Sequence, residues 1–427
     1  MAVGTVPSLY DGSSERRAPA DQATVRRANL GLVLRHLRDS GPRSRARIAQ
    51  ETGLNKATVS SLVAELAERG LVSTGDVDRA GSVGRPGLTV HLDGACVCGI
   101  GVELNVDYAA VLVLDLRGEV LHEQRRALDI PALGAERTLD AVAALVTDAV
   151  AVAAAAGARP AGLTVAVAGL VRSVDGVVTL APNIGWRDVA VLDGLRTRLG
   201  VDFPIRVEND ANLSAIAEWA MGSEAGTPDL VYLTGEVGVG GGVVVAGRLL
   251  RGAGGLSGEV GHTSLGDPDR VCGCGRRGCW ETVVGLAALL RAAADPGDPV
   301  HDPGRDLETR LAEVARRAED GDARTLAALE EVGTSLGAGA AVLINVFNPR
   351  VVLLGGYFAV LGRFLMTPLL AELETRVLAP GMAGARVVLS TLGFTAAVRG
   401  GAHVALESVL DDPTLVPVAA LAPAGAP

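Results

Sequence analysis

Apolar residues in the first part of the chain recur at helical spacing. Between Thr24 and Asp39 they share one face of a helix, at Val25, Leu30, Val33, Leu34 and Leu37. The pair Gly41-Pro42 ends this helix, because glycine favours a turn and proline cannot continue a helix. Residues 1–22 are rich in Gly, Ser, Pro and charge without periodicity, so we expect a disordered arm there.

Two shorter amphipathic segments follow between Ser44 and Gly70. Ser44 is placed to cap a first short helix, Gly53 to form a sharp turn, and Asn55 to cap a second helix. Two short helices joined by a glycine turn predict a helix-turn-helix. A purely structural helical hairpin is the alternative, although a helix that serves only the core seldom begins with so many short polar residues.

The polar start of the second helix suits base edges and phosphates in a major groove. Two strand-like stretches within Leu71–Leu92 then predict a β-hairpin wing whose turn contains Gly84-Arg85-Pro86-Gly87, and an arginine held there suits a narrow minor groove. We therefore expect a winged helix-turn-helix domain over residues 23–92. The residues expected to contact DNA are Arg45, Asn55, Lys56, Thr58, Ser60, Ser61 and Arg85.

From Cys98 onward the pattern changes to apolar strands separated by longer helical runs. Two strands, an Ala/Val-rich helix at 139–156 and a strand at 162–168 follow one another, an order that suggests an α/β lobe. A glycine-rich stretch at 235–242 and a helix-rich region after Glu281 extend this pattern. We expect an α/β domain over residues 95–411, with a cleft near 209–281, and a flexible tail over 412–427.

Charge separates the two expected domains. Residues 1–92 hold 13 Arg/Lys and 9 Asp/Glu, and the remainder holds 26 and 40, within a chain of net charge −10. A basic module on an acidic body is the asymmetry of a DNA-binding domain joined to another function. We expect no apolar run of membrane-spanning length and no signal peptide, and hence a cytoplasmic protein without a membrane partner.

One stretch groups residues by chemistry: Gly258–Glu281 holds His262, Cys272, Cys274 and Cys279. Three soft thiolates and one imidazole suit a tetrahedral zinc ion, and a closed set of four ligands makes that zinc structural. A disulfide-bearing or merely Cys-rich loop is the alternative. Glu259 and Glu281 flank the ligands, so a metal that fixes this loop would fix their carboxylates too.

The same stretch carries a family resemblance. It reads G-E-V-G-H followed by C-x-C-G-x-x-G-C-x-E, which resembles the zinc signature of the ROK family of sugar kinases and sugar-responsive repressors. The winged helix-turn-helix with its G-R-P segment also resembles the N-terminus of the family's repressors. The resemblance implies an actin-like, ribonuclease-H-like fold of two lobes around a cleft. Because operators are commonly palindromic, we expect a homodimer or a dimer of dimers.

The resemblance also implies a sugar site, with hydroxyls held by Asn209, Asp210, Glu259, His262 and Glu281. Carboxylates accept strong hydrogen bonds from hydroxyls, and an amide both donates and accepts them. Asn209 and Asp210 stand where a strand gives way to a helix, a usual place for a binding group in α/β folds. The alternative roles are a helix cap for Asp210 and solvated surface charges for the glutamates.

The phosphate motifs of the family's kinases are altered in this chain. In the first motif, the kinase sequence D-x-G-G-T is replaced by Glu103-Leu104-Asn105-Val106-Asp107. The second motif of the kinases has a G-T-G core, and here Val237 takes the place of the threonine, with Glu236 beside it. A carboxylate in place of a phosphate cradle repels a nucleotide by a few kcal/mol.

These features predict a sugar-responsive DNA-binding repressor that needs zinc, operator DNA and a monosaccharide or sugar derivative as effector, and that has no enzymatic activity. A sugar kinase with an attached DNA-binding domain is the alternative, in which Asp210 would be the catalytic base. A protein that binds DNA but no sugar is a third possibility.

Overall fold

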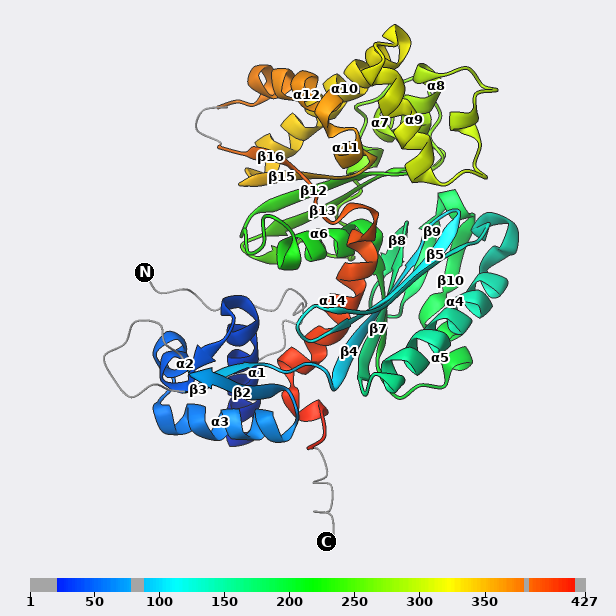
Figure 1. Ribbon diagram of the computed structural model, residues 1–427. Helices are drawn as coiled ribbons and strands as arrows, with labels where there is room; N and C mark the ends of the chain where they lie inside the picture. The colour runs from blue at the N-terminus through cyan, green and yellow to red at the C-terminus, as the bar shows by residue number, and fades with distance from the viewer. Residues whose placement is uncertain (1–20, 78–87, 380–383, 419–427) are drawn as a thin grey trace.

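The computed structural model describes residues 21–77, 88–379 and 384–418. Figure 1 shows three parts: an N-terminal domain at the lower left, a first lobe beside it, and a second, helix-rich lobe at the far end. The last long helix, α14 (Ala396–Asp411), runs from between the two lobes to the N-terminal domain. Helix α14, near the end of the described residues, therefore returns to the N-terminal domain.

The N-terminal domain has the predicted winged helix-turn-helix order. Its elements are α1 (Gln22–Ser40), β1 (Arg43–Ser44), α2 (Arg45–Thr52), α3 (Lys56–Glu68), β2 (Val72–Val77) and β3 (Leu88–Leu92), with sheet order β1-β3-β2. Asn55 caps α3 through its side-chain oxygen, which accepts from the Thr58 N–H at 2.8 Å. Ser44 precedes α2 as expected, but its side chain makes no capping hydrogen bond.

Two expectations fall on parts of the chain outside the described residues. The wing turn with Arg85 lies in the gap between β2 and β3. Of the expected disordered arm, only the end is described, where Asp21 accepts from the Thr24 N–H at 2.7 Å and caps α1. Helix α1 therefore begins within the segment that its composition assigned to the arm.

The first lobe is a mixed sheet with helices on both faces, one of which is covered by α14, and a small second sheet. The main sheet has the order β11-β7-β4-β5-β6, in which β4 pairs in parallel with β7 and antiparallel with β5. The strands and helices are β4 (Val97–Leu104), β5 (Tyr108–Asp115), β6 (Val120–Ala127), α4 (Ile130–Ala155), β7 (Arg159–Val167), β8 (Leu170–Arg172), β9 (Val177–Ala181), β10 (Trp186–Ala190), α5 (Val191–Leu199) and β11 (Ile205–Asn209).

The second lobe is built on another five-stranded sheet, of order β14-β13-β12-β15-β16. Helix α6 (Asp210–Met221) continues directly from β11 of the first lobe and crosses to this sheet. The other elements are β12 (Leu230–Gly235), β13 (Val239–Val245), β14 (Arg248–Leu249), α7 (Glu281–Val284), α8 (Leu286–Ala293), α9 (Leu307–Glu319), α10 (Ala323–Phe347), β15 (Val351–Gly356), α11 (Tyr357–Val360), α12 (Gly362–Arg376) and β16 (Arg386–Leu389). Figure 1 shows α7 to α12 gathered at the outer end of this lobe. The α/β class and the two-lobed arrangement agree with the expectation.

Helix α14 joins the lobes to the N-terminal domain. Its apolar side shares one core with α1 and α3, so the N-terminal domain does not have a separate hydrophobic core. Glu407 on α14 accepts from Arg38 on α1 at 2.7 Å, and Asp411 pairs with Arg35. The Glu407 carboxylate is largely buried, and its pairing favours a fixed contact, because an unpaired buried charge is costly.

Residues 412–418, which the sequence places in a flexible tail, also contact this domain. The short 3-10 helix Pro413–Leu415 follows α14, and the carbonyl of Val416 accepts from the Arg69 guanidinium at 2.5 Å. Arg69 stands at the C-terminal end of α3. The end of the helix-turn-helix is therefore tied to the end of the chain.

Two helices reach the length and composition of a membrane span, contrary to the expectation that no apolar run does so. They are α4 and α10, and their most apolar windows are 44% and 61% buried inside the protein. In both helices the buried residues pack in the cores of the lobes. Core helices of this kind pass the same test of length and composition, so the two helices are weak evidence for a membrane span.

Candidate effector cleft and metal cluster

A cavity of about 390 Å³ lies between the two lobes. The first lobe contributes its lining from the ends of β7 and β11, and the second lobe from β13 and the segment that precedes α7. All five residues expected to hold a sugar line this cavity: Asn209, Asp210, Glu259, His262 and Glu281. Asn209 and Asp210 thus meet residues 49 to 72 positions further along the chain, because the two lobes pack around one cavity.

The strand-to-helix turn after β11 places Asn209 and Asp210. Asn209 is the cap of α6, since its side-chain oxygen accepts from the Asn212 N–H at 3.0 Å and its amide nitrogen donates to the Gly169 carbonyl at 3.1 Å. The alternative role of Asp210 as the cap of this helix is therefore taken by its neighbour. Asp210 stands in the first turn of α6, and its carboxylate lines the cavity.

The metal cluster lies at the opposite wall. His262, Cys272, Cys274 and Cys279 each offer one ligand atom, and these atoms lie within 4.8 Å of one another. The Cys274 and Cys279 sulfurs are 3.7 Å apart, and the Cys272 sulfur is 3.6 Å from His262 Nδ1. A tetrahedral zinc with Zn–S bonds of about 2.3 Å separates its sulfurs by roughly 3.8 Å. The donor set and spacing therefore fit a metal of this kind.

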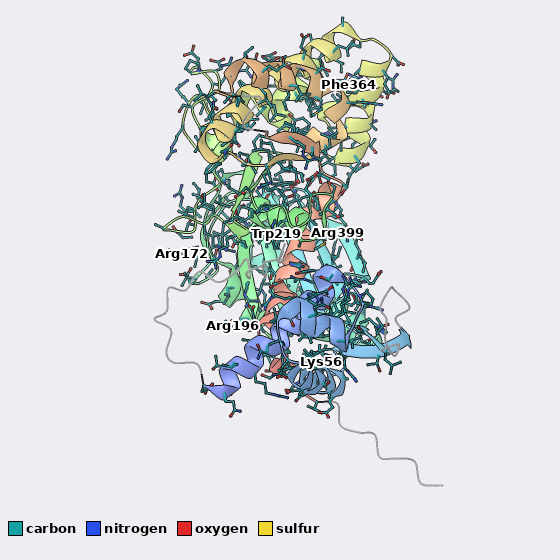
Figure 2. The ribbon with its side chains drawn as sticks, turned by 90° about the vertical axis from the view of Figure 1, so that its left-hand side faces the viewer. Lys56, Arg172, Arg196, Trp219, Phe364 and Arg399 are labelled. Atoms are coloured by element: carbon teal, nitrogen blue, oxygen red, sulfur yellow. The ribbon has the colours of Figure 1, made fainter. Side chains whose placement is uncertain are left out.

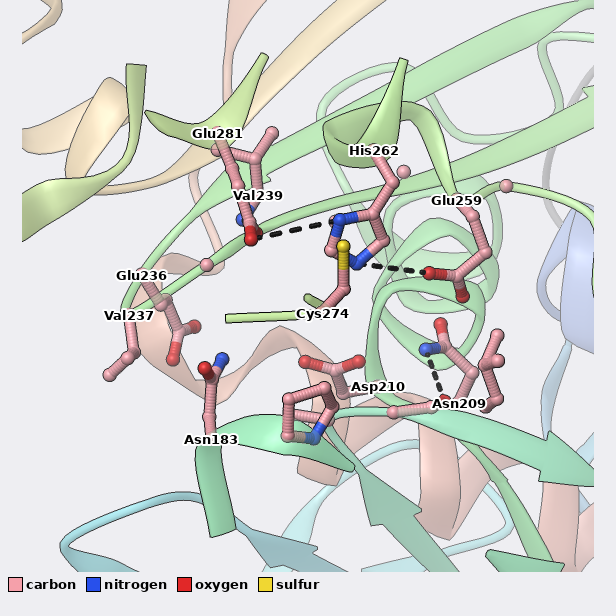
Figure 3. A pocket seen from close by; sticks show the side chains of 18 of the residues that line it. Asn183, Asn209, Asp210, Glu236, Val237, Val239, Glu259, His262, Cys274 and Glu281 are labelled. Carbon is pink, nitrogen blue, oxygen red and sulfur yellow. Dashed lines mark hydrogen bonds and ion pairs between the residues drawn. The ribbon is translucent and has the colours of Figure 1, made fainter. Parts of the chain in front are cut away.

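His262 joins the metal cluster to the cavity. Its Nδ1 faces the cysteines, while its Nε2 lies 3.8 Å from Glu259 Oε2; Glu281 Oε1 lies 3.7 Å from Nδ1. Figure 3 shows the imidazole between the two glutamates, with Asp210 facing them from the other side of the cavity. The His262 ring can thus contact the metal with one nitrogen and present the other to the cavity.

Burial dominates the electrostatics of the cavity wall. It raises the pKa of Glu259 to about 7, and the charges of Asp210 and Glu281 act in the same direction. Burial also raises the pKa of Asp210. Carboxylates in these surroundings gain strongly from hydroxyl donors, because each hydrogen bond replaces hydration that burial has removed.

One end of the cavity is closed by a hydrogen bond between the lobes. The Asn105 amide donates to Glu236 Oε2 at 2.5 Å, from the turn after β4 to the turn after β12. Behind it, the Tyr108 hydroxyl donates to Glu103 Oε1 at 2.7 Å, and burial raises the pKa of Glu103 to about 7. Of the two carboxylates in the altered phosphate motifs, Glu236 lines the cavity at this end and Asp107 is not among the lining residues.

Of the glycines in the 235–242 stretch, Gly238 lines the cavity, and Gly240, Gly241 and Gly242 have packing roles. A side chain at Gly240 or Gly242 would come within 3.0 Å of Ala211 or Ala215 on α6, and one at Gly241 would meet Val260. These positions let β13 lie close against α6. Their presence therefore follows from the packing of the second lobe and gives no evidence for a phosphate loop.

The described residues of the expected DNA-binding set lie at the start of α2 and in the cap and first half of α3, and Arg85 is outside the described residues. Lys56 begins α3, and Figure 2 shows it at the opposite end of the molecule from Phe364 in the second lobe. Arg45 and Ser60 are also exposed, and Thr58 is half-buried. Ser60 donates to the Lys56 carbonyl, Ser61 accepts from Arg26 at 3.3 Å, and Asn55 serves as the cap. Among the described residues of this set, Lys56 and Arg45 are thus the exposed cations.

Sequence reasoning did not select three further residues that line the cavity, namely Asn183, Leu256 and Arg276. Asn183 belongs to the Pro182–Ile184 turn after β9, and Arg276 lies between the cysteines of the metal cluster. Leu256 carries no chemical signal that distinguishes it from a core residue. The spacing of Arg276 within the cysteine motif was the one available sign of a cavity role.

Comparison with known proteins shows which families the two parts of the chain resemble. A model of the ROK family matches residues 99–408, and a model of the MarR family matches residues 31–81. The xylose repressor of Bacillus subtilis (strain 168) is 28% identical over 397 residues, which cover 92% of this chain and 98% of that protein. The relative thus extends over both the N-terminal domain and the lobes.

Two solved structures of ROK family proteins are similar to this chain. A ROK family transcriptional regulator, described as a homologue of the E. coli MLC protein, superposes with a TM-score of 0.73 at 26% identity and covers 91% of this chain and 97% of its own. A ROK family glucokinase from Streptomyces griseus, in complex with glucose and AMPPNP, gives a TM-score of 0.61 at 29% identity and covers 73% of this chain and 99% of its own. The family match spans more than half of the chain, and the chain therefore belongs to the ROK family.

Proposed function

We propose that this protein is a transcriptional repressor that responds to a monosaccharide or a sugar derivative. The observation that carries the proposal is the combination, in one chain, of a winged helix-turn-helix with an exposed Lys56 and a cleft lined by hydroxyl-accepting carboxylates. The similarity to a xylose repressor over nearly the whole chain supports it. The protein acts in the cytoplasm, where its operator is.

In this proposal sugar hydroxyls bind Asn209, Asp210, Glu259, His262 and Glu281. Asp210 on the first wall and Glu259 on the second accept from different hydroxyls of one ligand, so the ligand bridges the lobes. Binding then favours the closed arrangement, because only that arrangement offers both walls at once. His262 Nε2 faces the cavity and supplies a donor next to these acceptors.

The metal in this proposal is zinc, held by His262, Cys272, Cys274 and Cys279. A bound zinc supplies structural cross-linking, because four protein ligands leave no open coordination position. The chain's own contribution is to keep Glu259 and Glu281 on the same segment as the ligands. The Cys3His set therefore orients the second wall of the sugar site.

The signal passes to DNA through α6, α14 and α1. Asp210 stands in the first turn of α6, and α6 crosses α14 where Gly400 faces the Leu213 carbonyl. At its other end α14 crosses α1 where Gly31 faces the Leu410 carbonyl. Crossings this close transmit a shift of one helix to the next, because neither contact leaves room for independent movement. In a homodimer or a dimer of dimers, the shift alters the spacing of two α3 helices on a palindromic operator.

The kinase alternative receives less support. Asp210 is retained in the cleft, and the structure resembles a glucokinase solved with glucose and AMPPNP. However, Asn105 donates a hydrogen bond to Glu236 where the two altered phosphate motifs meet between the lobes. Glycines 240–242 allow close packing of β13 against α6 and Val260. We propose that Asp210 accepts a sugar hydroxyl and transfers no proton to a reaction.

The test combines binding, DNA release and turnover. Purified protein is screened by thermal shift against monosaccharides and their phosphates, since a ligand of the folded state raises its stability. The best sugar is then added to a complex of the protein with an operator selected from random DNA. The proposal predicts a change in operator affinity and no ADP production with ATP. Sustained ADP production that Asp210→Asn abolishes would establish the kinase alternative instead.

A further inference from the structure

Glu208 is a buried carboxylate directly beside the sugar-binding pair, and no role has been assigned to it so far. It is the second-to-last residue of strand β11, directly before Asn209, and its exposed fraction is 0%. A buried carboxylate is expected to have several partners, because an unsatisfied charge in the interior is costly. Its two oxygens divide their contacts between the two lobes.

The first oxygen fixes the strand-to-helix turn. Glu208 Oε1 accepts from the Asn209 backbone N–H at 3.1 Å and from the Asn212 side-chain amide at 3.2 Å. The same turn carries the capping contact of Asn209 and the first residue of α6, Asp210. Glu208 therefore helps to set the direction in which Asp210 faces the cavity.

The second oxygen reaches across to the second lobe. Glu208 Oε2 accepts from Arg251 Nη2 at 3.2 Å and from Arg251 Nε at 3.3 Å. Arg251 lies near the start of segment 250–259, which follows β14. Within this segment the Ser257 N–H donates to the Arg251 carbonyl at 3.1 Å and so closes a loop. Leu256 and Glu259 of this segment line the cavity. The ion pair thus holds the segment against the first lobe.

We infer that Glu208 is a positioning residue of the effector site. One carboxylate fixes the Asn209–Asp210 turn and, through Arg251, keeps segment 250–259 over the sugar. The inference rests on the proposed function of the cleft as an effector site. It predicts that the ion pair contributes to sugar affinity by ordering the cleft, although neither Glu208 nor Arg251 needs to touch the sugar.

Glu208→Gln separates the two halves of this arrangement. Glutamine keeps an oxygen that can accept from Asn209 and Asn212, while its amide group presents donors to the Arg251 guanidinium, which has no acceptor. The turn is therefore retained and the contact between the lobes is lost. Arg251→Gln breaks the same contact from the other side, at a side chain that is 21% exposed and so more tolerant of change.

The experiment measures sugar affinity by calorimetry on the full-length, zinc-loaded protein, with D-xylose, D-glucose and N-acetyl-D-glucosamine as probes. Both variants are expected to bind the sugar that wild type prefers about ten- to a hundredfold more weakly, with unchanged zinc content. The double variant should lose less than about twofold beyond either single variant, because two changes to one contact are not additive. Glu218→Gln is the matched control, a buried glutamate on α6 that binds Ser390, and should change affinity less than about threefold.

Hydrogen exchange supplies the readout that a general loss of stability would not give. Sugar should protect segment 250–259 in wild type and in Glu218→Gln, and this protection should be lost in Glu208→Gln and Arg251→Gln. Variants that bind sugar and protect this segment like wild type, or whose effects add, would overturn the inference. If none of the three sugars binds, the best sugar of the thermal-shift screen takes their place. If wild type binds no sugar of that screen, the proposed function fails, and the inference fails with it. Arg251→Gln decides the matter should Glu208→Gln not fold.

Discussion

The contact between α1 and α14 offers the sharpest test of how the cleft is linked to DNA. Gly31 on α1 faces the carbonyl oxygen of Leu410 on α14, and a methyl group at position 31 would lie within 3.0 Å of that oxygen. Ordinary contacts of this kind begin at 3.4 Å. The added carbon would lie 2.3 Å from this oxygen, so Gly31→Ala requires the helices to move apart by roughly 1 Å, since neither backbone can yield locally.

The cost of Gly31→Ala in free energy arises at the contact between α1 and α14. Overpacking costs about 1–3 kcal/mol, while alanine stabilises a helix by about 1 kcal/mol relative to glycine, so α1 itself remains folded. Allosteric coupling energies are typically about 1–3 kcal/mol, and 1.4 kcal/mol is about tenfold in affinity. A strained α1–α14 contact can thus remove most of the coupling without removing either binding activity.

The assay is fluorescence anisotropy of labelled operator with and without saturating sugar. We expect the ratio of the two operator dissociation constants to fall about tenfold toward one in Gly31→Ala, while sugar affinity measured without DNA changes little. Gly297→Ala is the control, because nothing lies within 4 Å of the added methyl group there. A Gly31→Ala variant that keeps the wild-type ratio would refute the proposed route through α14.

Four further predictions follow from other contacts. Cys274→Ser should lower zinc content and sugar affinity together, and metal analysis that finds no zinc in fresh wild type would contradict the zinc assignment. Glu407→Gln should destabilise the folded protein by about 1–3 kcal/mol in urea denaturation, because it removes the largely buried carboxylate that pairs with Arg38 and leaves Arg38 with Asp39 alone; an unchanged midpoint would show that this ion pair is unimportant. Burial raises the pKa of Glu103 to about 7, so this carboxyl group binds more protons in the folded than in the unfolded protein. Wild type should therefore lose stability as the pH rises from about 4.5 to 7, and Glu103→Gln should lose less. Parallel pH profiles of the melting temperature in the two proteins would contradict this. Lys56→Ala should weaken operator binding and reduce the salt slope by about one if Lys56 contacts a phosphate, and an unchanged affinity would place the DNA surface elsewhere.

The sequence was informative wherever the signal lay within one segment. The helix-turn-helix could be predicted because apolar spacing and the Asn55 cap act over a few residues, and the structure confirms both. The metal ligands could be grouped because three cysteines lie within eight positions and their chemistry is unusual. The position of Asn209 and Asp210 at a strand-to-helix turn followed from the change of pattern from period two to 3.6.

Contacts between distant segments were decided only by the tertiary structure. Glu236 rather than Asp107 lines the closed end of the cavity, because the pairing of the lobes brings the turn after β12 to Asn105. The sequence likewise gave no sign that Glu208 would meet Arg251, or that α14 would share a core with α1. Pattern and composition determine which residues are buried within a helix or strand, but the partner of a buried charge depends on how all the elements pack. The sequence by itself therefore determined the kinds of domain and the chemistry of the cleft, and the packing of the lobes decided which side chains face one another across it.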